Sequence, residues 1–340
     1  MKHLNIKYPI LSAPLDGGFT SPDLVSIISK HDCLGSYAGG RIKFAQFEQD
    51  IQTIQAQTQH PFIVNLYTPE SYTIEPDAVQ LAIKALDPIF KRYELTPQLP
   101  SNDPVKDQKR FNEKVDLLIQ LKVPYCSFSF GIPDSSVIKR LKDAGVCLLA
   151  TANTADEAKQ IELAGFDIVI AQGIEAGGHR GGLLTDSERV SLEDLLPAVV
   201  QEVKIPVIAA GGIMTKEDVD KYLKLGAVAV QMGTAFLLCD ESTASDTYKE
   251  MILAADSDQT ILTRVYSGRE TRVIPNKFVE QLSHYENQAI LPYPAQRSLT
   301  KSIQKAAFKA QDVDYMPLWC GMYGYKGKRQ RVSQLLASLR

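Results

Sequence analysis

The sequence is poor in cysteine and has no long run of apolar residues. Its five cysteines are scattered among 340 residues without a Cys-x-x-Cys pair, a pattern that indicates neither a disulfide framework nor a cysteine metal site. No stretch approaches the roughly 18 apolar residues of a membrane-spanning helix, and residues 1–14 lack the apolar core of a signal peptide. We therefore expect a cytoplasmic protein with buried free thiols, without a metal and without a membrane partner.

An excess of positive charge is also absent. Lys and Arg number 37 against 40 Asp and Glu, which gives a net charge of −3, so the charge balance does not indicate a nucleic acid partner. Hydrophobic residues make up 44% and charged residues 23% of the chain, which is typical of a globular protein. The length suits one large domain with an extension, or two domains.

Eight short apolar runs recur along the first two thirds of the chain. They are continuously apolar rather than alternating, which is typical of parallel strands covered on both faces. The runs span residues 9–14, 33–38, 62–67, 125–130, 146–151, 167–172, 206–211 and 227–232. Between them lie segments with helix start signals, in which Ser21, Thr154, Ser191 and Thr215 are the expected N-caps.

Strands that alternate with helices in this way predict an α/β fold, a (β/α)8 or TIM barrel. A doubly wound open sheet is the alternative, but the first strand is not followed by Gly-x-Gly-x-x-Gly. We expect the barrel over residues 1–238, with residues 311–340 packing back on it. Residues 239–310 are expected to form a smaller, mainly helical lid domain, and residues 68–110 a long excursion after the third strand.

Glycines follow the last two expected strands, in "AGGI" (210–213) and "QMGT" (231–234). Barrels commonly bind a phosphate at this position, where backbone N–H groups are accessible, and the Thr234 hydroxyl adds a donor. Asn65 and Gln172 also stand at strand ends. A carboxamide there suits the N3–H and carbonyl edge of a flavin ring, although a buried core amide explains each residue equally well.

His179 lies in the glycine-rich segment "QGIEAGGHRGG" (172–182), directly after the sixth strand. An imidazole at a strand end is placed to accept a proton near neutral pH. The other histidines are weaker candidates for a catalytic role, since His31 and His60 are expected at helix ends and His284 in the helical extension. Arg180 is expected to be a solvated side chain rather than an anion ligand.

Together with this segment, five others resemble the nitronate monooxygenase family, formerly called 2-nitropropane dioxygenases, and its class I members in particular. They are "APLDGG" (13–18), "FIVNLY" (62–67), "PVIAAGGI" (206–213), "QMGTAF" (231–236) and "MPLWCGMY" (316–323). The resemblance implies a TIM barrel that binds FMN under a second domain. It also implies oxidation of alkyl nitronates, especially propionate 3-nitronate, by dioxygen to carbonyl compounds and nitrite, a detoxifying reaction.

The resemblance also implies roles for individual residues. His179 carries over as the base for neutral nitroalkanes or as an electrostatic partner of the nitronate. Ser129 stands where the family often has a histidine, and Leu15 where it usually has methionine. Tyr293 and Tyr323 are candidates for the substrate pocket. The implied FMN contacts are Asn65, Gln172, Gly177, Gly212, Gln231, Gly233 and Thr234.

The implied partners are the nitronate and dioxygen, and we expect a monomer or homodimer. Two other functions stay open. The first is an FMN-dependent enoyl-acyl-carrier-protein reductase that uses NADH, since those barrels share a similar histidine loop. The second is a non-catalytic flavin-binding protein.

Overall fold

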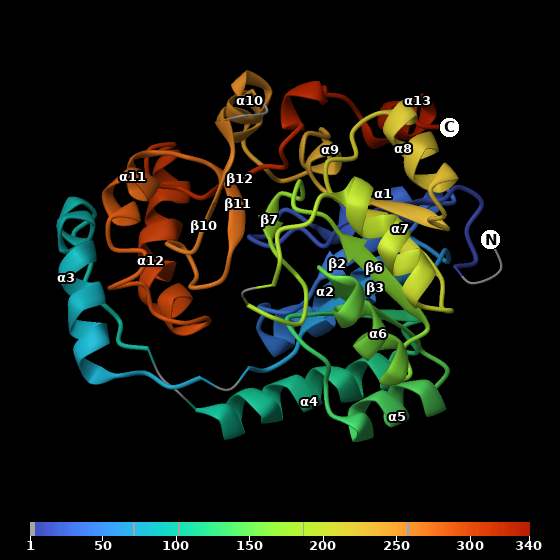
Figure 1. The fold of residues 1–340 in the computed structure, drawn as a ribbon, viewed down its shortest axis with the longest axis horizontal. Helices are drawn as coiled ribbons and strands as arrows, with labels where there is room; N and C mark the ends of the chain where they lie inside the picture. Colours follow the sequence, from blue (N-terminus) through green and yellow to red (C-terminus); the bar gives the residue numbers. More distant parts are fainter. Residues whose placement is uncertain (1–3, 71, 101–102, 186, 257–258) are drawn as a thin grey trace.

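The computed structural model describes residues 4–70, 72–100, 103–185, 187–256 and 259–340. Its centre is an eight-stranded parallel sheet with helices around it (Figure 1). The strands are β1 (Ile10–Ser12), β2 (Gly35–Ala38), β3 (Phe62–Tyr67), β4 (Tyr125–Ser129), β5 (Cys147–Ala152), β6 (Ile168–Gln172), β8 (Val207–Ala210) and β9 (Ala229–Met232). Seven of them lie within the predicted apolar runs, and β5 extends one residue beyond its run, which ends at residue 151.

The sheet curls until its two edge strands meet. The strand order is β1-β9-β8-β6-β5-β4-β3-β2, and β1 reaches the segment before β2 through a parallel bridge between Leu11 and Leu34. The Leu34 N–H donates to the Ile10 carbonyl at 3.1 Å, and Ser12 N–H donates to the Leu34 carbonyl at 3.0 Å. The predicted (β/α)8 barrel is confirmed.

Helices cover the outside of the barrel, and four of them begin where the sequence places them. They are α1 (Pro22–Lys30), α2 (Phe44–Gln57), α4 (Pro104–Gln120), α5 (Ser135–Asp143), α6 (Ala155–Leu163), α7 (Leu192–Glu202), α8 (Lys216–Lys224) and the short α9 (Thr234–Leu237). The four predicted N-caps, Ser21, Thr154, Ser191 and Thr215, each accept a hydrogen bond from a first-turn N–H. Three connections from a helix to the next strand, after α5, α6 and α8, contain a glycine with positive φ, namely Gly145, Gly165 and Gly226.

Residues 239–310, which we call the lid segment, lie to one side of the barrel (Figure 1). They form α10 (Asp246–Ala254), α11 (Lys277–Ser283) and α12 (Ala295–Ala310), as well as two strands that the sequence did not predict, β10 (Ile261–Thr263) and β11 (Thr271–Ile274). Strand β11 pairs with β12 (Leu318–Trp319) and also with β7 (Gly178–His179). The histidine loop of the barrel is therefore part of the lid sheet.

The predicted excursion after β3 contains α3 (Pro76–Arg92), which packs against α12 and lies beside the lid helices in Figure 1. The Arg92 side chain pairs with Asp312 at 3.0 Å, and the Tyr93 hydroxyl donates to the same carboxylate at 2.7 Å. At the C-terminus, α13 (Val332–Ser338) packs on α1. The division into two domains at residues 238 and 310 stays a prediction.

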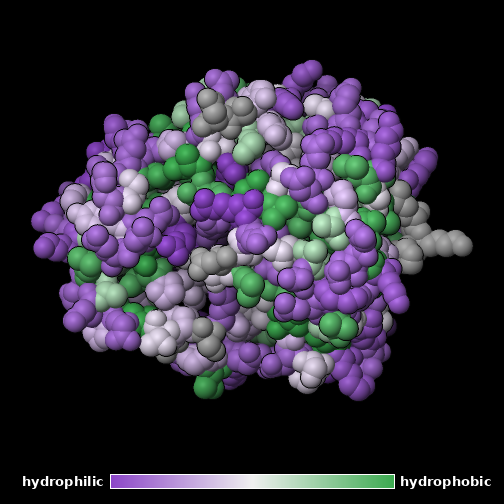
Figure 2. Space-filling view, in the orientation of Figure 1, coloured by the Kyte–Doolittle hydropathy of each residue, from purple (hydrophilic) through white to green (hydrophobic). Residues whose placement is uncertain are grey.

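The described residues hold four buried cysteines and the half-buried Cys147, all as free thiols. Among those residues, no group of three or more His, Cys, Asp or Glu side chains is arranged to hold a metal ion. No helix in the described part of the chain has the length and apolar character needed to cross a membrane. On the face drawn in Figure 2, hydrophilic residues predominate and hydrophobic ones appear in separate small groups.

Candidate active site

A cavity of about 1100 Å³, its open mouth included, lies at the carboxyl ends of the barrel strands. Its size is that of a site for a cofactor or small ligand. Ten of the eleven predicted site residues line it, because parallel strands deliver their ends to one rim. These ten are Asn65, Ser129, Gln172, Gly177, His179, Gly212, Gln231, Gly233, Thr234 and Tyr323.

Tyr293 is the predicted residue that the structure places differently. Its ring packs edge-on against Phe130, with 5.2 Å between the ring centroids, and Phe130 is the residue that lines the cavity. Tyr293 therefore contacts a residue of the cavity wall, and a direct contact with substrate stays a prediction.

The glycines after β8 and β9 form a cradle that the C-terminal segment covers. Gly212 has a φ of +67°, and a Cβ there would lie 2.9 Å from the Tyr323 ring, so this position requires glycine. A Cβ on Gly177 would collide with the backbone nitrogen of Gly321. Gly321 N–H donates to the Thr234 hydroxyl at 3.0 Å, which leaves the hydroxyl hydrogen for an acceptor such as a phosphate oxygen.

Asn65 has an unsatisfied acceptor at the cavity wall. Its Nδ2 donates to the Ser127 carbonyl and hydroxyl and to the Ser129 hydroxyl at 3.0–3.3 Å. Its Oδ1 is buried and has no hydrogen-bond partner. Because an unpaired buried carbonyl oxygen is costly, Oδ1 is suited to accept from a ligand N–H. The N3–H of a flavin ring fits that requirement.

Gln172 lines the same cavity, but its side chain is engaged by the protein. Its Oε1 accepts from Gly181 N–H at 2.7 Å and from Asn153 Nδ2 at 3.0 Å. Its Nε2 donates to the His179 carbonyl at 3.2 Å. Gln172 thus positions the histidine loop, and direct contact with a cofactor stays a prediction.

His179 is held from the lid side. Its backbone pairs with Thr271 of β11, and its Nε2 lies 2.9 Å from the hydroxyl oxygen of Ser267, a buried residue. The same hydroxyl donates to the Arg269 carbonyl at 3.2 Å. When the hydroxyl hydrogen serves that carbonyl, Nε2 must be the donor and Nδ1 carries the basic lone pair.

The surroundings of His179 favour the neutral imidazole. Burial lowers the pKa of His179 well below its usual value of 6.5, and the Arg41 guanidinium lowers it further, while the Asp16 carboxylate opposes the shift. The lowered pKa therefore favours the uncharged ring at neutral pH. An uncharged imidazole can take up a proton, and an arriving anion would raise its pKa again.

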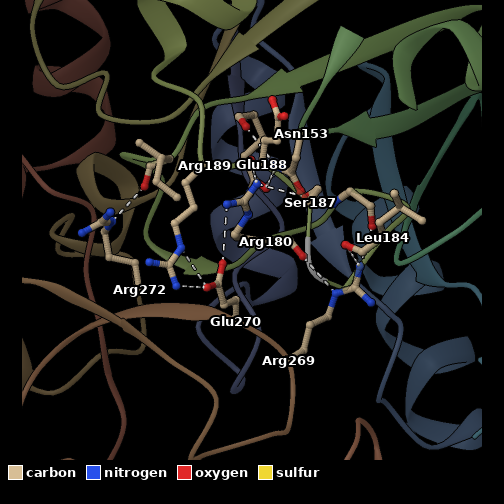
Figure 3. A network of polar contacts seen from close by, with 12 residues as sticks. Asn153, Arg180, Leu184, Ser187, Glu188, Arg189, Arg269, Glu270 and Arg272 are labelled. Atoms are coloured by element: carbon tan, nitrogen blue, oxygen red, sulfur yellow. Dashed lines mark hydrogen bonds and ion pairs between the residues drawn. The ribbon is translucent and has the colours of Figure 1, made fainter. Parts of the chain in front are cut away.

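Arg180 is not solvated, so the sequence prediction for it is wrong. The residue is only 6% exposed, and its guanidinium donates to the Ser187 hydroxyl and the Glu188 carbonyl and pairs with Glu270 at 3.5 Å (Figure 3). Glu270 also pairs with the exposed Arg189. These contacts fasten the loop after His179 to the lid segment.

Arg269 extends this network and was missed in the sequence. It is 1% exposed and donates to the carbonyls of Arg180, Gly182 and Leu184 at 2.6–3.3 Å (Figure 3). Its remaining nitrogen pairs with Glu70 at 2.6 Å. One side chain thus joins the histidine loop, the lid segment and the excursion after β3.

Sequence reasoning also missed the polar groups beside His179. Asp16 and Arg41 follow the ends of β1 and β2. A search for polar residues at strand ends, which identified Asn65, could therefore also have identified these two. Ser267 and Arg297 come from the lid segment, where no motif marks them. Their role depends on how the lid segment folds onto the barrel.

Comparisons with known protein sequences indicate one family. The family described as nitronate monooxygenase matches residues 1–340. The chain is 39% identical to a probable nitronate monooxygenase of Bacillus subtilis, over 100% of this chain and 97% of the relative. It is 38% identical to one of Staphylococcus haemolyticus, over 99% and 94%.

Two solved structures resemble this chain over nearly its whole length. A nitroalkane oxidase from Streptomyces ansochromogenes has a TM-score of 0.91 and 36% identity to this chain, over 98% of this chain and 95% of that one. FabK from Thermotoga maritima has a TM-score of 0.75 and 26% identity, over 99% and 93%.

Proposed function

The chain belongs to the nitronate monooxygenase family of oxidoreductases, and we propose that it is an FMN-dependent enzyme that oxidises alkyl nitronates, propionate 3-nitronate among them, with dioxygen to a carbonyl compound and nitrite. One observation carries the proposal. A partly buried histidine with a lowered pKa, an unpaired Asn65 oxygen and a glycine cradle line a single cavity at the strand ends. The reaction would remove reactive nitronates from the cell.

The residues fit FMN at both ends of the molecule. Gly212, Gly233 and Thr234 would hold the phosphate, and Asn65 the polar edge of the ring. When bound, the flavin supplies the redox chemistry, taking electrons from the substrate and delivering them to dioxygen. The task of this chain is to bind the anion against the ring and to exclude water.

His179 would perform the one proton transfer that a neutral nitroalkane requires. A nitronate has already lost its α-proton, so it needs no base, whereas a nitroalkane needs one in the uncharged form. The lowered pKa of His179 provides that form at neutral pH. Ser267 fixes the ring orientation through its contact with Nε2.

Replacing Ser267 with alanine is expected to lower kcat/KM for neutral nitroethane about three- to tenfold, because the ring loses the hydrogen bond that orients it. The rate with the nitronate should stay nearly unchanged. Steady-state kinetics with both substrates measure the difference between the two effects. Ser302→Ala is the matched control, since the Ser302 hydroxyl is buried without a partner. Equal losses with the two substrates would argue against an orienting role.

The pH dependence should reflect the lowered pKa of His179. Since kcat/KM reports the free enzyme, the inflection in the value for neutral nitroethane should lie well below pH 6.5, with the activity falling as the pH falls through it. A histidine with its usual pKa of about 6.5 would already have lost half its basic form at pH 6.5. A pH profile measured with freshly diluted nitroethane tests this expectation. An inflection at pH 6.5 or above would contradict the assignment of His179 as a base with a lowered pKa.

The proposal is tested against the enoyl reductase alternative with two assays on the FMN-loaded protein. Nitrite should form when propionate 3-nitronate is added in air without NADH. In the second assay, NADH and a crotonyl thioester are supplied, and no NADH oxidation above the background should follow. Thioester-dependent NADH oxidation without nitrite formation would replace the proposed function with the alternative.

A further inference from the structure

A cluster of charged residues adjoins the cavity on the His179 side, and the proposed function leaves it unused. Asp16 and Tyr67 line the cavity, and Asp16 forms an ion pair with Arg41. The Arg41 guanidinium lies 5.3 Å from the centroid of the Tyr67 ring and 5.6 Å from that of Tyr293. Arg297, from the first turn of α12, acts on the same groups, and like Arg41 it lies next to the lining residues rather than among them.

The cluster contains two guanidinium groups and one carboxylate. Burial alone would raise the pKa of Asp16, but Arg41 and then Arg297 outweigh burial and hold that pKa below its usual value. Burial, followed by repulsion from Arg41, lowers the pKa of Arg297 to about 10, so Arg297 stays charged at neutral pH. With His179 neutral, one positive charge is left without a negative partner.

Several donors of the cluster are also unsatisfied. Nη2 of Arg41 and both Nε and Nη1 of Arg297 are buried without a hydrogen-bond partner among the described residues. Leaving a buried charged donor unpaired is costly. The site is therefore arranged for one additional anion.

The start of α12 adds to this preference. The helix has no side-chain cap at Pro294 and no acidic residue in its first turn, so the positive end of its dipole is not neutralised locally. Lys301, one turn after Arg297 on the same helix, is exposed and adds positive charge. A guanidinium group binds a planar, two-oxygen anion such as a carboxylate in bidentate geometry.

We propose that Arg297, assisted by Arg41, determines substrate specificity by binding a carboxylate at the end of the substrate remote from its nitronate group. The inference rests on the proposed function and extends it to the substrate's second end. The reacting nitronate must lie at the flavin beside His179, whereas Arg297 comes from the lid helix. Nitronates with a carboxylate tail are therefore preferred over those with an apolar tail.

The test compares propionate 3-nitronate with propyl 1-nitronate, which has three carbons and no carboxylate. Arg297→Gln should raise KM for propionate 3-nitronate at least tenfold with kcat within threefold, since a hydrogen bond to a charged group is lost. The values for propyl 1-nitronate should change less than threefold. Arg297→Lys should restore part of the preference. Lys309→Gln removes one charge ~18 Å along the same helix and should change neither substrate.

Two kinetic outcomes overturn the proposal. Equal losses with the two nitronates would mean that Arg297 serves the nitronate group or the fold, and no loss with either would mean that no carboxylate binds there. Calorimetric titration of the FMN-loaded protein with succinate is a second test, which measures binding and does not depend on turnover. Succinate should bind the wild type at least tenfold more tightly than Arg297→Gln, and equal or absent binding overturns the subsite. If no nitronate is oxidised, the proposed function fails and this titration alone decides the subsite.

Discussion

Replacing His179 with asparagine is expected to lower kcat/KM for neutral nitroethane about 10²- to 10⁴-fold, the usual contribution of a general base. The expected loss with ethyl nitronate is less than tenfold, because that anion needs no proton removed. Asparagine is polar and cannot act as a base at neutral pH, but it is too short to keep the 2.9 Å contact that Nε2 makes with Ser267. Parallel steady-state assays with the two forms of one compound measure the difference.

The His179→Asn comparison also separates the two roles that the sequence left open. A base is needed only by the nitroalkane, whereas an electrostatic partner of the anion would be needed by both forms. The flavin content of the variant must equal that of the wild type, because the ring lines the cofactor cavity. Equal losses with both forms at equal flavin content would contradict the base assignment.

Replacing Arg269 with alanine is expected to lower the free energy of unfolding by about 3–5 kcal/mol, the usual cost of removing one member of a buried ion pair. Glu70 would lose its partner, and the carbonyls of Arg180, Gly182 and Leu184 would lose their donor. The histidine loop would lose one of the links that join it to the lid segment. Urea titration followed by circular dichroism measures the change.

Arg189→Ala is the matched control for Arg269→Ala. Arg189 also pairs with an acidic side chain, Glu270, but its own side chain is 62% exposed. An exposed ion pair contributes at most about 1 kcal/mol. Similar destabilisation by the two substitutions would show that burial of Arg269 does not matter.

The barrel was predictable because its signals are local. Each buried parallel strand is a continuous apolar run, and residues such as Ser21 and Thr215 mark the helix starts within three residues. Strand β7 has only two residues, Gly178 and His179, which is too short for any periodicity. Its pairing with β11 joins segments about ninety residues apart, so no local pattern could indicate it.

The site residues that lie at strand ends could be predicted from the sequence. Asn65, Gln172 and His179 converge because the barrel delivers the ends of β3 and β6 to one rim. Arg180 was misjudged because an arginine beside a glycine loop looks exposed until the lid segment covers it. Ser267 and Arg297 went unnoticed for the same reason, since their roles arise only when the lid packs against the barrel.

Oxygen consumption by the FMN-loaded protein is the most direct test of the central claim. Rapid uptake is expected when propionate 3-nitronate is added without NADH, and nitrite should accumulate as oxygen is consumed. The apoprotein, prepared by removing the flavin, should show no uptake. A flavin-replete protein that consumes no oxygen with propionate 3-nitronate, propyl 1-nitronate or ethyl nitronate would contradict the assigned reaction.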